Sequence, residues 1–79
     1  MRVVAEIPHP DFKITVFSWN EKYLLKLERG MLEQTYKISA MDVSGDDEIK
    51  NMLSEDFLKT VGNIFMQMRR ALGDAMDMV

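Results

Sequence analysis

Cysteine is absent from this 79-residue chain, and histidine and tryptophan occur once each. Without cysteine the chain has no disulfide, no thiolate nucleophile and no cysteine-ligated metal, which is compatible with a reducing cytosol. The N-terminal stretch "MRVVAEIPHP" has an apolar run of only three residues before Glu6, shorter than the apolar segment of a signal peptide. No stretch approaches the ~20 apolar residues of a membrane span. We therefore expect a cytoplasmic protein that does not enter a membrane.

Positive charge is also scarce. Ten Lys and Arg residues stand against thirteen Asp and Glu, giving a net charge of −3, and the only adjacent basic pair is Arg69–Arg70. Binding to nucleic acid requires a patch of basic side chains that displaces counterions from the phosphates. We therefore expect no nucleic-acid partner.

Motifs for catalysis and metal binding are missing as well. His9 lies between two prolines, with no sequence motif that supplies a nucleophile or an orienting partner. The stretch "DVSGDDE" starts like a calcium-binding loop, but Asp47 stands where that loop needs Gly and Leu53 where it needs Glu. No glycine-rich phosphate loop is present. We predict that the protein is not an enzyme and binds no cofactor or metal.

The residues that are present make an ordinary globular composition, with 47% hydrophobic and 29% charged residues. The length predicts one domain over residues 1–79. A domain of this size buries only about 60% of the surface that its unfolded chain exposes, so its own core stabilises it modestly.

The pattern predicts an α+β fold that starts with an antiparallel β-meander of three to four strands over about residues 2–39. A two-residue loop at Asn20-Glu21 sets Phe17 opposite Leu24, an apolar pair that favours this register. A type I′ turn there needs positive φ at both positions. Residues 3–7 are a short β-prone run that would add the fourth strand.

A second loop at residues 29–30 is predicted to return the chain into the last strand. The resulting register sets Lys22 opposite Lys37 and places Gln34 on the buried face. A bulge or a longer loop would relieve both problems.

Two helices are predicted to follow, a short one near 46–53 and a long one near 55–76, with Ser44 and Ser54 as start signals. The long helix is expected to pack across one face of the sheet. At 100° per residue its apolar arc comprises Phe57, Val61, Ile64, Phe65, Met68, Leu72 and Ala75, with Leu58 and Met76 at its edge.

Three large apolar side chains do not fit the buried face of this sheet. Phe17, Trp19 and Leu24 all fall on the opposite face. The first strand or the chain ends could fold over them, a partner could cover them, or they could be simply exposed. A cluster of this kind more often marks an interaction surface, and Trp is enriched at interface hot spots.

Gly62 and Met66 are a secondary candidate contact on the long helix. A mid-helix glycine costs about 1 kcal/mol relative to alanine, which the close approach of another backbone, from the sheet or a second subunit, would explain. The alternative is an ordinary glycine and a solvent-exposed methionine.

The sequence thus predicts a small interaction domain that is a homodimer through Phe17, Trp19 and Leu24. One alternative is a monomeric regulatory or adaptor module for a different protein. A less favoured alternative is a small-molecule binder, for which Gln34 and Tyr36 are the only polar-tipped candidates beside the core.

Overall fold

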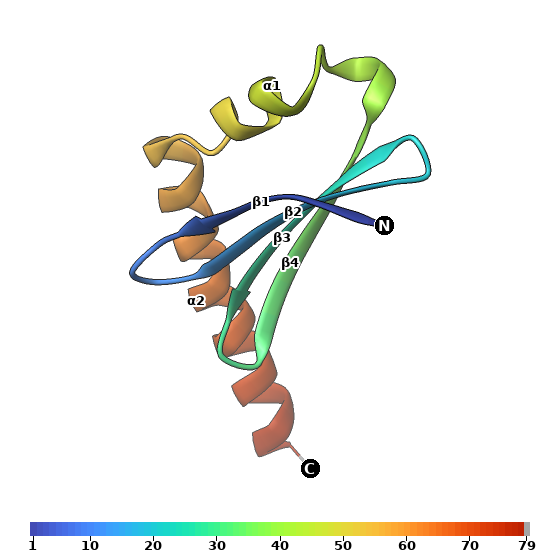
Figure 1. Ribbon diagram of the computed structural model, residues 1–79. Helices are drawn as coiled ribbons and strands as arrows, with labels where there is room; N and C mark the ends of the chain where they lie inside the picture. Colours follow the sequence, from blue (N-terminus) through green and yellow to red (C-terminus); the bar gives the residue numbers. More distant parts are fainter. Residues whose placement is uncertain (79) are drawn as a thin grey trace.

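The computed structural model describes residues 1–78, and it confirms the predicted α+β fold, with a four-stranded antiparallel sheet in the order β1-β2-β3-β4 (Figure 1). The elements are β1 (Arg2–Pro8), β2 (Lys13–Trp19), β3 (Lys22–Arg29), β4 (Leu32–Ser39), the short 3₁₀ helix η1 (Ala40–Asp42), α1 (Asp46–Asn51) and α2 (Glu55–Asp77). The first strand joins the sheet at its edge, beside β2.

The β2–β3 hairpin has the predicted register, with Phe17 opposite Leu24 and Lys13 opposite Glu28. Its two loop residues, Asn20 and Glu21, have φ angles of 51° and 61°. Positive φ at both positions is the type I′ pattern, which matches the twist of the flanking strands. Asn tolerates this conformation, whereas Glu is strained in it.

The predicted register of the β3–β4 hairpin is wrong by two residues. The loop is Gly30-Met31, so Arg29 pairs with Leu32 and Lys22 pairs with Ser39. Gly30 has a φ of 59°, and a glycine in the first loop position is typical of a type II′ turn. A shift of two residues keeps every side chain on its predicted face. It also removes the predicted pairing of two lysines.

Strand β1 contains a bulge between Val3 and Ala5. Ala5 therefore pairs with Val16 on one face of the sheet, whereas Val3 pairs with Phe17 on the other. A bulge inserts one extra residue, which reverses the alternation of side chains beyond it. As a result Val3 joins the face that carries Phe17.

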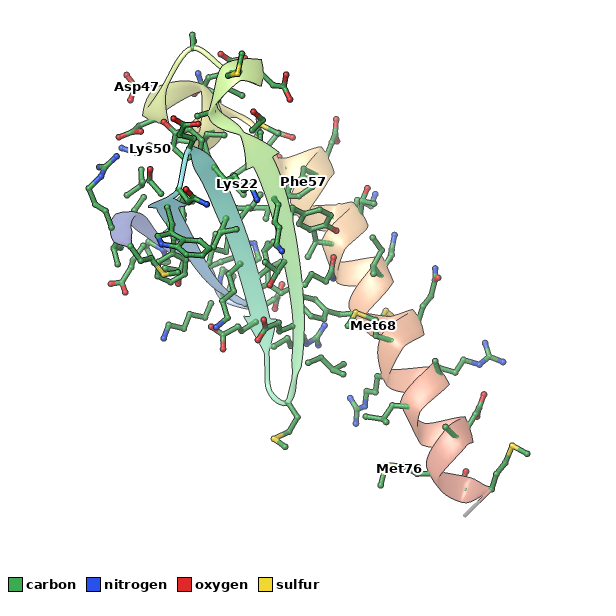
Figure 2. The ribbon with its side chains drawn as sticks, turned by 90° about the vertical axis from the view of Figure 1, so that its right-hand side faces the viewer. Lys22, Asp47, Lys50, Phe57, Met68 and Met76 are labelled. Atoms are coloured by element: carbon green, nitrogen blue, oxygen red, sulfur yellow. The ribbon has the colours of Figure 1, made fainter. Side chains whose placement is uncertain are left out.

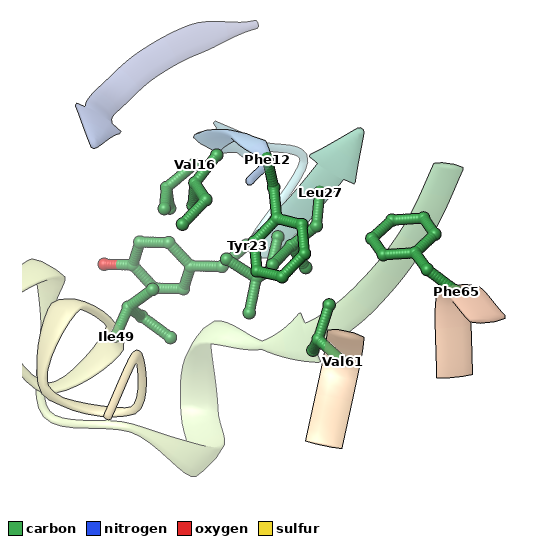
Figure 3. Close-up of a cluster of buried hydrophobic side chains, with 9 residues drawn as sticks. Phe12, Val16, Tyr23, Leu27, Ile49, Val61 and Phe65 are labelled. Carbon is green, nitrogen blue, oxygen red and sulfur yellow. The ribbon is translucent and has the colours of Figure 1, made fainter. Parts of the chain in front are cut away.

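The core lies between the sheet and α2, which covers one sheet face only (Figures 2 and 3). Its buried apolar side chains are Phe12, Ile14, Val16, Tyr23, Leu25, Leu27, Ile49, Val61 and Phe65. Gln34 is buried among them, as predicted, and its amide donates to the Val61 carbonyl at 3.0 Å. This bond ties β4 to the middle of α2.

The two helix starts differ in how well they were predicted. Ser54 caps α2, its Oγ accepting the amide of Phe57 at 3.2 Å. Ser44 does not cap α1, because Gly45 is the N-cap residue. Instead, the Ser44 amide and hydroxyl both donate to the Glu48 carboxylate at 2.6 Å. These bonds hold the pKa of Glu48 below its ordinary value.

The last turns of α2 run past the end of the sheet (Figure 2). All residues from Arg69 to Met78 are exposed, so the predicted burial of Leu72, Ala75 and Met76 is wrong. The molecule measures 45 × 25 × 19 Å, with a Cα radius of gyration of 14.1 Å, against about 12 Å for a compact chain of this length. We call residues 69–78 the α2 overhang.

Candidate functional site

The sheet face that α2 does not cover is here called the outer sheet face. Its side chains, by strand register, are Val3, Glu6, Pro8, Lys13, Thr15, Phe17, Trp19, Lys22, Leu24, Lys26, Glu28, Glu33, Thr35, Lys37 and Ser39. Strand pairing sets Val3, Phe17 and Leu24 side by side across three strands. Trp19 extends this row along β2. The three residues singled out from the sequence therefore belong to one apolar row.

The row is only partly covered by its neighbours. Val3 is 53% exposed and Trp19 is 51% exposed, whereas Phe17 and Leu24 are half-buried. Strand β1 lies within the sheet and does not fold over the row. In the part of the chain that the structure describes, no element packs on this face (Figures 1 and 2).

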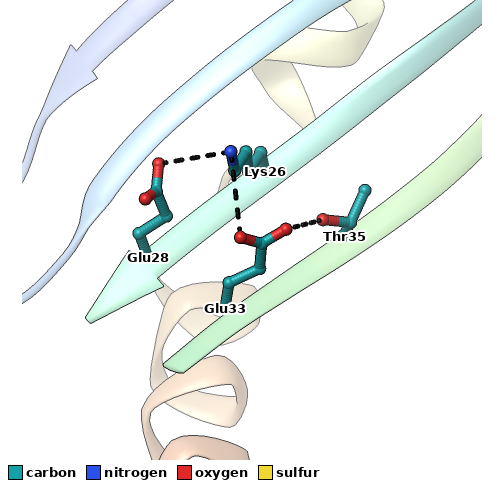
Figure 4. A network of polar contacts seen from close by, with 4 residues as sticks. All are labelled: Lys26, Glu28, Glu33 and Thr35. Carbon is teal, nitrogen blue, oxygen red and sulfur yellow. Dashed lines mark hydrogen bonds and ion pairs between the residues drawn. The ribbon is translucent and has the colours of Figure 1, made fainter. Parts of the chain in front are cut away.

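Charges of both signs lie along the outer sheet face. Lys22 lies opposite Trp19, whereas Lys37 lies opposite Leu24 and so extends the apolar row onto β4. At the other end Glu28 is directly opposite Glu33, and Lys26 lies between the two carboxylates at 3.8 Å from each (Figure 4). The ion pairs offset the repulsion between the glutamates.

Gly62 and Met66 lie on α2, on the other side of the sheet from this row. The structure therefore does not bring the two parts of the predicted interface together. A Cβ built at Gly62 would lie 3.6 Å from the ring of Phe12, an ordinary van der Waals contact. The group that lies close to Gly62 is thus a side chain of the same chain, and alanine would also fit at this position.

Met66 borders a groove that the sequence did not reveal, between α2 and the tip of the β3–β4 hairpin. We call it the α2 groove, and its volume is about 410 Å³. It is lined by Arg29, Gly30, Met31, Leu32, Phe65, Met66, Arg69 and Leu72. Most of these side chains are apolar, and the two arginines supply positive charge.

A polar network joins the sheet to α1. The Tyr23 hydroxyl donates to Asp46 Oδ1 at 2.6 Å, and Arg2 lies 3.6 Å from Asp46 Oδ2. The hydrogen bond lowers the pKa of the Asp46 carboxyl, and it raises the pKa of the Tyr23 hydroxyl. The partners of Asp46 come from distant strands, which local sequence does not show.

The polar side chains beside the core are already paired. The Tyr36 hydroxyl donates to Gln34 Oε1 at 2.6 Å, and Gln34 holds the Val61 carbonyl. Within residues 1–78, every buried side-chain nitrogen or oxygen has a partner. Neither Gln34 nor Tyr36 is left to orient a small molecule, and neither lines the α2 groove.

His9 lies in the β1–β2 connection, stacked on Phe12 at a centroid distance of 4.6 Å. Its Nδ1 accepts the amide of Asp11 at 3.1 Å. Within residues 1–78, no three His, Cys, Asp or Glu side chains form a group that could hold a metal ion. Neither α1 nor α2 is long and apolar enough to cross a bilayer.

Comparisons with protein-family models, with curated proteins and with solved structures find no match to this chain.

Proposed function

We propose that this protein is a small, non-enzymatic protein–protein interaction domain that forms a homodimer through its outer sheet face. The row of Val3, Phe17 and Leu24 beside Trp19 supports this proposal. Contiguous apolar patches on a surface mark interaction sites, and aromatic residues dominate their binding energy. A cytoplasmic setting stays a prediction from the sequence.

A second copy can cover this face in an isologous contact. A two-fold axis that crosses the strands at the level of Phe17 and Leu24 sets the apolar row of one copy against the same row of the other. This apolar row carries the proposed contact, since charges of both signs are mixed along the strands of the face.

The small core also favours self-association. Nine apolar side chains are buried, and all of them belong to the helix side of the sheet or the segments around it. The outer row adds little to this core while it remains in water. Dimerisation would bury it at about 25 cal/mol per Å² of apolar surface.

The test is the mass of the protein in a dilution series, measured by light scattering after size separation. Phe17→Lys combined with Trp19→Ala should lower the associated mass, because it removes the two largest side chains of the row. Met52→Lys is the matched control, since it places a lysine on an exposed methionine at the end of α1, away from the row.

Circular dichroism establishes that the variants are folded. A folded double variant that keeps the wild-type mass at every concentration would contradict the proposed interface. A wild type that is monomeric throughout, with Trp19 open to a quencher, would instead favour the adaptor alternative.

A further inference from the structure

The α2 overhang keeps an apolar stripe that nothing in residues 1–78 covers. At 100° per residue, Leu72 and Met76 lie within about 60° of the buried Val61 and Phe65. The stripe that packs on the sheet therefore continues beyond it. There Leu72 is 50% exposed and Met76 is 65% exposed.

The overhang is also a poor helix end by itself. Its last turn contains Asp74 and Asp77 and no basic residue, whereas the C-terminal end of a helix favours positive charge. A positive side chain from another surface would therefore stabilise this last turn.

The α2 groove has the complementary properties. Leu32 and Phe65 give it an apolar lining, and the Arg69 side chain also lines it. Among residues 1–78, no carboxylate lies within 4.0 Å of the Arg69 guanidinium. A Cβ built at the neighbouring Gly73 has nothing within 4 Å, so a second helix can approach α2 there.

We propose that the α2 overhangs of two copies pair antiparallel, each lying across the α2 groove of the other. Leu72 and Met76 of one copy would enter the groove of its partner. The same arrangement brings Asp77 of one copy to Arg69 of the other, and the two-fold axis repeats each contact. A second copy fits better than an unrelated protein, because each chain carries both halves of the contact. The overhang supplies apolar side chains for the partner's groove, and it supplies Asp77 for Arg69 of the partner.

This contact uses residues on the opposite side of the sheet from the proposed dimer face, so it is independent of that proposal. If both contacts form, each chain has two isologous interfaces, and the assembly is larger than a dimer. If only the groove contact forms, the protein is a dimer that does not depend on Phe17.

The test is a charge swap followed by sedimentation velocity at low salt, made both in the wild-type chain and in the Phe17→Lys, Trp19→Ala chain. Asp77→Arg should weaken the contact about tenfold, since the symmetry changes two surface ion pairs at once. Adding Arg69→Asp should restore it, because the swapped charges attract again. Leu72→Lys should abolish it.

Asp74→Arg is the matched control for Asp77→Arg, with the same charge change in the same helix turn. By helix geometry Asp77 lies within about 20° of the groove-lining Met66, whereas Asp74 lies about 80° from Met66 and about 140° from Arg69. Asp74→Arg should therefore leave the association unchanged. These positions are exposed, so the variants should remain folded.

The results separate the two proposals. If the outer-face variant still associates, and this association responds to Asp77→Arg and recovers with Arg69→Asp, the groove contact is supported whatever the outer face does. If the outer-face variant is monomeric at all concentrations, or if Asp74→Arg weakens association as much as Asp77→Arg, the groove contact is wrong.

Discussion

The two faces of the sheet bury their side chains in different ways. On the inner face, α2 and α1 cover Leu25, Leu27 and their neighbours, and Gln34 satisfies the polar groups beside them. On the outer face, Val3 and Trp19 remain half exposed beside Phe17. The inner face is thus explained by the folding of one chain. The outer face leaves apolar surface in water, and this is the surface of the proposed dimer.

The largest difference between the faces should appear in the stability of the dilute, dissociated chain. Phe65→Ala removes a buried ring from the inner face and should lower the free energy of unfolding by about 3–5 kcal/mol. Trp19→Ala should lower it by about 2 kcal/mol, because only half of that side chain is buried in the single chain. Urea unfolding well below the association range measures both. Equal losses would mean that the outer row is part of the core.

A smaller effect is expected at the turn between β2 and β3. Glu21 has a φ of 61°, and this conformation costs a residue with a Cβ about 1 kcal/mol or more relative to glycine. Glu21→Gly should therefore stabilise the chain by about 1 kcal/mol and leave its association unchanged. Thermal unfolding and sedimentation of the same sample check both parts. A loss of stability would show that the Glu21 side chain has a favourable role of its own.

The smallest effect concerns the attachment of α1 to the inner face. The pKa of Asp46 is lowered in the folded protein, chiefly by the hydrogen bond from Tyr23. The stability that this carboxylate contributes is present above its ordinary pKa, and it is lost as the pH falls through the lower folded value. Asp46→Asn should therefore be less stable than the wild type at neutral pH, and the gap should close in acid. A gap that stays constant with pH would contradict this role.

Much of the fold could be predicted from the sequence, because period-two alternation assigns each strand residue to a face. The pairing of Phe17 with Leu24 followed from the loop at Asn20-Glu21 and is confirmed. The second hairpin was misplaced, since the position of Gly30 within the turn decides the register. The faces were correct in both hairpins, because the first register was right and the second was wrong by an even number of residues.

The candidate surfaces were predictable only in part. Val3 was missed because the bulge in β1 turns it to the outer face, and a bulge leaves no clear sign in a single sequence. The overhang was missed for a different reason. Helix periodicity shows that Leu72 and Met76 belong to the apolar stripe, but the length of the sheet that covers the stripe is a tertiary property.

The most direct test of the outer-face dimer uses Trp19, the only tryptophan in the chain. Its fluorescence emission and its quenching by a neutral solute are compared between the wild type and Phe17→Lys, both folded and at the same high concentration. The account predicts that wild-type Trp19 emits at shorter wavelength and is quenched less, because a second copy covers it. Equal emission and equal quenching in the two proteins would contradict it.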